Sequence, residues 1–203
     1  VINFTPAPLV NAPNVSVCKN NPIANLLGYS STGTGTWTTL GSGVFNPSNS
    51  VPNPTYTPST ADTTAGSVLL IYTSTGNGGC NAVSDTMLLT FSAIPTVTAG
   101  PSQVVCSNNS TVTLNGTSST TSGTWTSSGT GTFAPNTANG NYVPSAADIS
   151  AGIVTLTLTT TNNGGCNAVT DVMTLTITPG PTSAVGADQT LCANNANVAL
   201  SGS

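Results

Sequence analysis

Apolar residues alternate with threonine along short stretches of this chain. Between Val154 and Thr160, single threonines separate Val154, Leu156 and Leu158, and Val112 and Leu114 alternate in the same way. A period of two places the apolar side chains on one face of an extended strand and the hydroxyl side chains on the other. Because no segment shows the period of an amphipathic helix, the pattern predicts half-buried β-strands and no helix.

A glycine-rich turn lies between two such runs, and the chain contains this turn twice. Gly78–Asp85 reads Gly-Gly-Cys-Asn-Ala-Val-Ser-Asp, and Gly164–Asp171 is the same segment 86 residues later, with threonine in place of serine. Turn residues between two alternating runs are typical of a β-hairpin. Each copy therefore predicts a hairpin with a cysteine near its tip.

The repetition extends over the whole chain. Cys18, Cys106 and Cys192 are each followed by one residue and then Asn-Asn, so each cysteine marks the head of a repeat. The repeat boundaries that follow are the end of a preceding repeat at 1–7, a first repeat at 8–94, a second repeat at 95–180, and the start of a third, truncated repeat at 181–203. We therefore expect this chain to be a window on a longer array.

Each repeat has room for about seven short strands with turns between them. One tryptophan per repeat, Trp37 or Trp125, follows the head cysteine by 19 residues and is expected to anchor a buried core. The sequence thus predicts an all-β fold of tandem immunoglobulin-like β-sandwich domains. Prolines in the junctions Ile94-Pro95 and Pro179-Gly180-Pro181 predict short, stiff connections and domains stacked end to end.

The composition narrows the classes of partner. Charged residues make up 3% of the chain, with one Lys or Arg in total and a net charge of −4, whereas ordinary domains carry about 25% charged residues. A single cation provides no basic surface, which excludes nucleic acid and anionic membranes as expected partners. No apolar run approaches the roughly 20 residues of a membrane helix, so this segment is not expected to insert into a membrane.

The chain also lacks the residues of common catalytic sites. With no His and no Glu, no ordinary group is available for acid–base catalysis near neutral pH, so we expect no enzyme activity and no cofactor. Asp62 and Asp148 each stand alone before a long predicted strand, where a carboxylate is expected to accept bonds from backbone N–H groups. A calcium site needs six or more oxygen ligands, so no metal is expected there. Lys19 is the only lysine, which excludes regular Lys–Asn isopeptide bonds.

The cysteines recur at fixed places and form no Cys-x-x-Cys pair of the metal-binding type. This usage favours disulfides and an oxidising, extracellular compartment. Pairs within a repeat would be Cys18–Cys80 and Cys106–Cys166, which leaves Cys192 without its partner. The recurring spacing favours this pairing slightly, although the head and the hairpin of one sandwich should lie at opposite ends, roughly 30 Å apart. The alternative is a bond between repeats, from Cys18 to Cys166.

One face differs between the two repeats. Where the second repeat has Thr155, Thr157 and Thr174, the first has Leu69, Ile71 and Leu88, which on paired strands would form an apolar patch. Two interpretations are open. Either the long loop near Asn46 to Pro54 covers the patch, or the patch is a contact surface for another chain.

The order of motifs resembles a known class of repeat. Ala-Gly-x-x-Gln-x-x-Cys, Gly-Thr-Trp, Tyr-x-Pro-Ser-x-x-Asp and Asp-x-Met-x-Leu-x-Ile are similar to the Ig-like/PKD-like repeats of giant Bacteroidota cell-surface proteins, which include gliding-motility adhesins exported by type IX secretion. In that class, Asp followed by Ser or Thr and an apolar residue carries O-glycans. Thr63 and Thr86 resemble such sites, whereas the second repeat has Ile149 and Val172 there.

These observations favour a structural function over a catalytic one. The leading hypothesis is a stalk or filament segment of a large secreted cell-surface adhesin, whose partners are neighbouring repeats of the same chain, other copies or surface proteins. One alternative is a glycan- or surface-binding module that uses the threonine-rich faces or the loop tips. Another is a passive spacer in a secreted multidomain enzyme.

Overall fold

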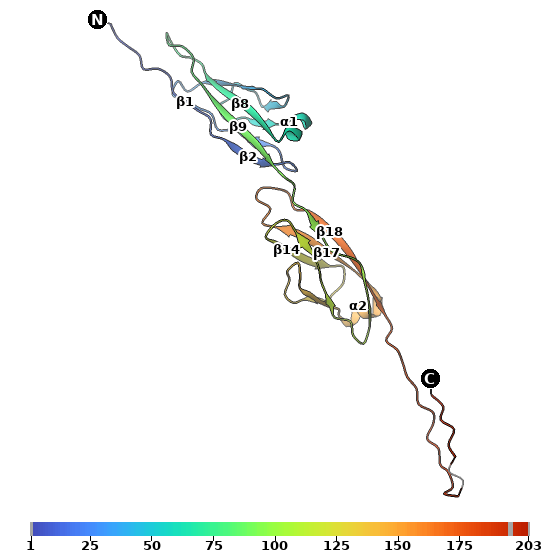
Figure 1. Ribbon diagram of the computed structural model, residues 1–203. Helices are drawn as coiled ribbons and strands as arrows, with labels where there is room; N and C mark the ends of the chain where they lie inside the picture. The colour runs from blue at the N-terminus through green and yellow to red at the C-terminus, as the bar shows by residue number, and fades with distance from the viewer. Residues whose placement is uncertain (1, 195–196, 203) are drawn as a thin grey trace. The chain divides into compact units, whose positions relative to one another are not determined.

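The computed structural model describes residues 2–194 and 197–202 (Figure 1). The chain forms two compact units. The first unit contains Val1–Val97, Ser118–Ser122 and Thr160–Val169, and the second contains Thr98–Thr117, Gly123–Thr159 and Thr170–Ser203. The tip of the second repeat's hairpin thus belongs to the first unit.

The first repeat forms strands and one short helix. They are β1 (Val10–Asn11), β2 (Val15–Cys18), β3 (Ala24–Asn25), β4 (Tyr29–Ser30), β5 (Gly35–Thr39), β6 (Val44–Asn46), β7 (Thr55–Thr57), α1 (Thr60–Ala65), β8 (Ser67–Ser74) and β9 (Ser84–Ser92).

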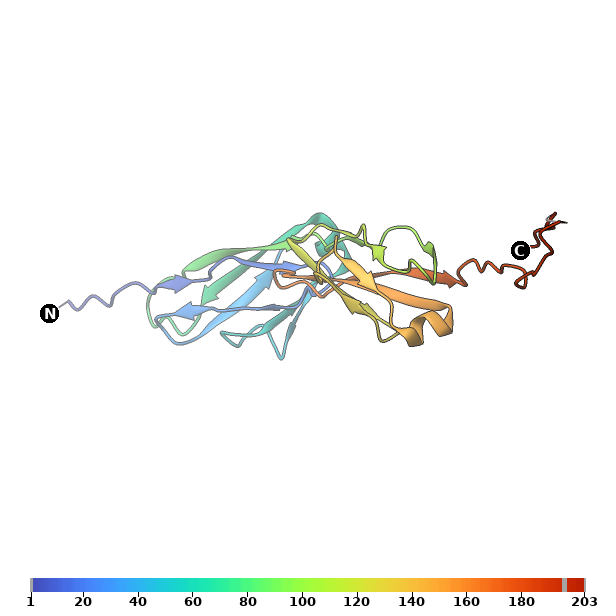
Figure 2. The ribbon, with the colours of Figure 1, turned by 90° about the horizontal axis from the view of Figure 1, so that it is seen from below.

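The strands of this repeat form a β-sandwich, in which the long strands β8 and β9 run side by side (Figures 1 and 2). One sheet has the order β2-β9-β8-β5, a second has the order β3-β7-β6, and β1 pairs with β4. The pairing of β2 with β9 is parallel, and β9 with β8 and β8 with β5 are antiparallel. Apolar side chains from both larger sheets meet in one core, which includes Trp37 of β5, Tyr56 of β7 and Leu70 of β8.

The second repeat forms the same elements in the same order. They are β10 (Val97–Thr98), β11 (Gln103–Cys106), β12 (Val112–Thr113), β13 (Thr117–Ser118), β14 (Ser122–Ser127), β15 (Thr132–Phe133), β16 (Asn141–Val143), α2 (Ala146–Ala151), β17 (Ile153–Thr161) and β18 (Thr170–Thr178). Its sheets, β11-β18-β17-β14, β12-β16-β15 and β10-β13, match those of the first repeat strand for strand.

The predicted all-β, immunoglobulin-like fold is confirmed. Each repeat has nine strands in the described residues rather than about seven, and several of them are only two residues long. Both tryptophans are buried as predicted, and each indole N–H donates to a backbone oxygen, from Trp37 to Pro52 at 3.0 Å and from Trp125 to Ala138 at 3.2 Å. The repeat boundaries and the end-to-end stacking stay predictions.

The prediction of no helix is wrong, since α1 and α2 each span six residues. Ser59 caps α1 and accepts a bond from the backbone N–H of Asp62, whose carboxylate accepts from Ser59 N–H in return. This reciprocal pair is a capping box, which needs no hydrophobic stripe to start a helix. Gly66 ends α1 in the left-handed conformation, with φ of 85°. No helix in the described part of the chain has the length and apolar character needed to cross a membrane.

Candidate functional site

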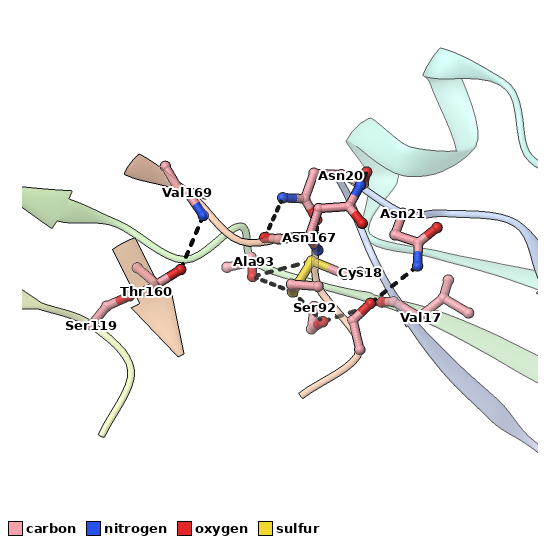
Figure 3. The surroundings of a disulfide bond; sticks show 12 residues. Val17, Cys18, Asn20, Asn21, Ser92, Ala93, Ser119, Thr160, Asn167 and Val169 are labelled. Atoms are coloured by element: carbon pink, nitrogen blue, oxygen red, sulfur yellow. Dashed lines mark hydrogen bonds between the residues drawn. A yellow bond between two sulfur atoms is a disulfide. The ribbon is translucent and has the colours of Figure 1, made fainter. Parts of the chain in front are cut away.

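A disulfide joins the head of the first repeat to the hairpin of the second. Cys18 is the last residue of β2 and is 1% exposed, and Cys166 lies in the turn between β17 and β18. Their Cα atoms are 4.9 Å apart, and 148 residues separate them in the sequence (Figure 3). Both residues belong to the first compact unit.

Asparagine side chains surround this disulfide (Figure 3). The Asn20 amide donates to the backbone oxygen of Asn167 at 3.1 Å, and its side-chain oxygen accepts from Asn167 N–H at 3.0 Å. The Asn167 amide donates to the backbone oxygen of Asn20 at 2.8 Å, and the Asn21 amide donates to Gly165 O at 3.2 Å. We call Cys18, Asn20, Asn21, Gly165, Cys166 and Asn167 the cysteine joint.

Local structure holds both halves of the joint in place. On the head side, Asn21 N–H donates to Cys18 O at 3.0 Å, and Lys19 N–H donates to Ser92 O at 3.1 Å, so the head turn is attached to the end of β9. On the hairpin side, Cys166 N–H donates to Asn163 O at 3.0 Å. Both sulfur atoms lie against the backbone oxygen of Ala93, at 3.7 Å from Cys18 and 3.6 Å from Cys166.

The pairing slightly favoured from the sequence, Cys18–Cys80 and Cys106–Cys166 within repeats, is wrong for Cys18 and Cys166. Because β2 runs parallel to β9, Cys18 lies beside Ser92 at the end of β9, whereas Cys80 precedes Ser84 at its start. Nine residues of strand separate the two ends by about 27 Å. A disulfide requires Cα atoms within about 7 Å, so strand geometry forbids the bond within a repeat.

The three other cysteines of the chain are free thiols. Cys80 is half-buried in the first hairpin, Cys106 is exposed at the end of β11, and Cys192 is exposed near the C-terminus. Cys80 and Cys106 were disulfide candidates from the sequence, as was Cys192 with no partner, whereas the asparagines had no predicted role. The recurrence of Asn-Asn after each head cysteine, and of Asn directly after each hairpin cysteine, was the available signal.

Asp62 and Asp148 accept bonds from backbone N–H groups, as predicted. The Asp148 carboxylate accepts from Thr130 N–H at 2.9 Å, Gly131 N–H at 2.8 Å and Ser145 N–H at 2.9 Å, and from the Tyr142 hydroxyl at 2.7 Å. The equivalent donors to Asp62 are the N–H groups of Ser42, Gly43 and Ser59 and the hydroxyl of Tyr56.

The environment lowers the pKa of both carboxyl groups. Burial by itself raises the pKa of Asp148, but the bonds from Ser145, Tyr142, Thr130 and Gly131 outweigh it and lower the pKa to about 2. The pKa of Asp62 is lowered in the same way, against the effect of burial, by bonds from Ser59, Ser42 and Tyr56. Both carboxylates are therefore ionised near neutral pH, with their oxygens occupied by protein donors.

A second pair of aspartates attaches the first strands of each repeat. Asp85 of β9 accepts from Ala12 N–H at 2.8 Å, and Asp171 of β18 accepts from Ala99 N–H at 2.8 Å. In the described residues, no group of three His, Cys, Asp or Glu side chains lies close enough to hold a metal ion.

The predicted apolar patch lies on neighbouring strands. Leu69 of β8 is paired in register with Leu88 of β9, and the two are 38% and 37% exposed. Ile71 is half-buried opposite Thr86. The loop near Asn46 to Pro54, which one of the two interpretations placed over the patch, is bonded through Asn49 to the backbone of Trp37 in the edge strand β5. The loop therefore leaves Leu69 and Leu88 open, and a contact function for the patch stays a prediction.

The two predicted glycosylation positions differ in accessibility. Thr86 is exposed on β9. Thr63 lies in α1, where its hydroxyl bonds to the backbone oxygens of Ser59 and Thr60. Glycosylation of either residue stays a prediction.

The structure thus defines tandem immunoglobulin-like domains joined by a disulfide between repeats. No protein-family model matches the chain, and no curated protein matches it.

Solved structures that match the chain have low sequence identity to it. Sidekick-1 immunoglobulin domains 1–5 are 17% identical over 90% of this chain and 41% of that one, with a TM-score of 0.43. Drosophila N-cadherin EC1–4 is 13% identical over 87% and 50%, with a TM-score of 0.41. The Clostridium thermocellum CbhA fibronectin(III)-like modules are 11% identical over 84% and 95%, with a TM-score of 0.38. The chain spans half or less of the first structures that it matches.

Proposed function

We propose that this chain is a structural segment of a large secreted cell-surface adhesin. In this function, tandem sandwich domains hold an adhesive tip away from the cell or build a surface filament. The observation that carries the proposal is the Cys18–Cys166 disulfide, which ties the head of one repeat to the hairpin of the next. A pulling force on the chain would pass through this covalent bond as well as through the linker at residues 93–96.

The disulfide also supports an extracellular location, since disulfides persist outside the cytoplasm and are rare within it. The composition fits the same setting. A chain with 3% charged residues has few ionic interactions for salt to screen, so its surface would behave alike at different ionic strengths.

The parent protein proposed here is of the Bacteroidota type that the repeat motifs resemble, namely a gliding-motility adhesin exported by type IX secretion. This finer assignment is supported by the motifs at Cys18, Gly35–Thr38 and Tyr56–Asp62 and by their counterparts in the second repeat. Neighbouring repeats of the same chain are the proposed partners, together with other copies or surface proteins at the tip.

Immunogold electron microscopy of intact producing cells, with antibody raised against this chain, tests the proposal. We expect gold particles along surface fibres and none on cells that lack the gene. Gold confined to the culture supernatant, with bare cells, would contradict the proposal and favour a spacer in a released enzyme. Fractionation with the same antibody provides the control, because a cytoplasmic signal would contradict secretion altogether.

A further inference from the structure

The head of the second repeat has the same local structure as the head of the first. Its cysteine is a free thiol, whereas Cys18 forms a disulfide. Cys106 ends β11 as Cys18 ends β2, and Asn109 N–H donates to Cys106 O at 2.9 Å to form the same turn. Ser107 N–H donates to Thr178 O at 2.8 Å, which matches the bond from Lys19 to Ser92. The head of the second repeat therefore has the same local structure as the head of the first repeat, which binds the Cys166 hairpin.

The asparagines of this second head are available. Asn108 and Asn109 correspond to Asn20 and Asn21 of the cysteine joint, and both are exposed. Within the part of the chain that the structure describes, neither side-chain amide has a hydrogen-bond partner, whereas those of Asn20 and Asn21 hold the bound hairpin.

The first repeat carries the matching hairpin, also with a free thiol. Cys80 N–H donates to Asn77 O at 3.0 Å, as Cys166 N–H donates to Asn163 O at 3.0 Å. The Asn77 amide donates to Ser74 O at 3.2 Å, and the Asn163 amide donates to Thr160 O at the same distance. The two hairpins thus share these hydrogen bonds around their cysteines, although the preceding glycine differs, since Gly165 has a φ of 89° and Gly79 has no positive φ.

The segment before the first repeat contacts Cys80 as the linker contacts Cys166. The Cys80 sulfur lies 3.7 Å from the Thr5 hydroxyl and 3.8 Å from Pro6 O. The Cys166 sulfur lies 3.9 Å from the Ser92 hydroxyl and 3.6 Å from Ala93 O. Around Cys80, Thr5 and Pro6 therefore take the place that Ser92 and Ala93 take around Cys166.

We propose that Cys106 with Asn108 and Asn109, and Cys80 with Gly79 and Asn81, are the two open halves of the same cysteine joint. Each half binds a neighbouring repeat of this type: the Cys106 head takes a Gly-Gly-Cys-Asn hairpin, and the Cys80 hairpin takes a Cys-x-Asn-Asn head. Because the two halves differ, the contact is head to tail and extends from repeat to repeat. The proposal concerns the ends of the repeats and does not rest on the adhesin function.

Closing one joint oxidises two thiols and needs a disulfide oxidant, such as oxidised glutathione. The Cys106 thiolate attacks one glutathione sulfur, forms a mixed disulfide and releases one glutathione thiol. The thiolate of the hairpin cysteine then attacks the Cys106 sulfur and releases the second glutathione thiol. Two protein thiols and one oxidised glutathione become one protein disulfide and two glutathione thiols.

The test adds the missing repeat to the full chain. A second copy of residues 95–180 is inserted after Gly180, with Cys106→Ser to remove its own head thiol and Ala168→Ser as a mass label on its hairpin. After refolding with reduced and oxidised glutathione, we expect peptide mapping to recover the original Cys106 bonded to the labelled Cys166. An original Cys106 that is alkylated, or a labelled Cys166 bonded to Cys80 or Cys192, overturns the proposal.

Substitution of an asparagine distinguishes a disulfide that forms because the head binds the hairpin from one that forms by random oxidation of two thiols. Asn108→Ala in the original head should lower the fraction of the new disulfide about tenfold at a fixed glutathione ratio, because the side chain of the equivalent Asn20 makes two hydrogen bonds of the joint. Asn139→Ala, at an exposed turn of the same repeat, is the matched control and should leave the fraction unchanged. An equal yield in both variants contradicts recognition by the head.

A second measurement uses the chain without an insertion, so that misfolding of the longer chain cannot hide the answer. With Cys192→Ser, two copies at high concentration can cross-link through Cys80 and Cys106 only. We expect Cys80–Cys106 bonds in clear excess over Cys80–Cys80 and Cys106–Cys106 bonds. Random proportions of the three bonds overturn the proposal.

Discussion

At the scale of single residues, the two buried aspartates each connect separate segments of one sandwich. Asp148 is 3% exposed, and its carboxylate connects the start of α2 to the turn at Thr130 and Gly131 and to the Tyr142 hydroxyl. Bonds to an ionised acceptor are roughly twice as strong as neutral ones. One ionised side chain therefore fixes three separate segments of the sandwich.

The lowered pKa of Asp148 makes stability depend on pH in the acid range. The folded pKa is about 2 and the ordinary value is 3.8, so the unfolded state binds more protons between these values. The stabilisation is fully present above about pH 5 and is lost as the pH falls through the folded pKa, a change of about 2 kcal/mol for Asp148 alone. Urea unfolding between pH 7 and pH 2 measures it, and Asp62 should add to the loss in the same direction.

Replacing the carboxylate isolates its contribution. Asp148→Asn should lower the free energy of unfolding at pH 7 by about 3 kcal/mol, because the amide keeps one acceptor oxygen and loses the charge. The same variant should show a flatter dependence of stability on pH. Asp188→Asn, at an exposed carboxylate in the described C-terminal segment, is the control and should change neither quantity. A pH dependence as steep in Asp148→Asn as in the parent chain would contradict the assignment.

At the scale of elements, the alternation of buried and exposed positions along β8 decides how far a substitution lowers the free energy of unfolding. Leu70 is fully buried in the core, whereas its neighbour Leu69 points to the other face and is 38% exposed. Leu70→Thr should cost about 3 kcal/mol of unfolding free energy through a lost buried side chain and an unpaired hydroxyl. Leu69→Thr should change it by less than about 1 kcal/mol, since threonine suits an exposed strand position. Comparable losses in the two variants would show that another part of the protein covers Leu69.

The strands and hairpins could be predicted from the sequence, whereas the helices and the disulfide could not. Alternation and turn residues located the long strands and both hairpins, because those signals are local. The helices were missed because six residues cannot display a hydrophobic period, although Ser59 and Asp62, three residues apart, contain the signal of a capping box. The disulfide could not be chosen from spacing, since it depends on β2 running parallel to β9. That pairing joins strands far apart in the sequence, so local patterns do not predict it.

At the scale of the whole molecule, the Cys18–Cys166 bond has a direct chemical signature. The chain has two methionines, Met87 and Met173, so cyanogen bromide cleaves after Met87 between the halves that the disulfide joins. Without reduction, residues 1–87 and the following fragment should migrate as one species, and reduction should separate them. Pairs within repeats would leave both bonds inside single fragments, and the fragments would separate without a reductant.

A variant makes this result specific to the joint. Cys166→Ser should abolish the linked species, whereas Cys192→Ser should leave it intact, because Cys192 is a free thiol. The sandwich cores contain neither Cys166 nor Cys192, so both variants should keep the strand content seen by circular dichroism. A linked species that survives in Cys166→Ser would mean that Cys106 bonds to Cys18 or to Cys80. In that event the open head proposed at Cys106 would already be filled, and the head-to-tail extension of the array would fail with it.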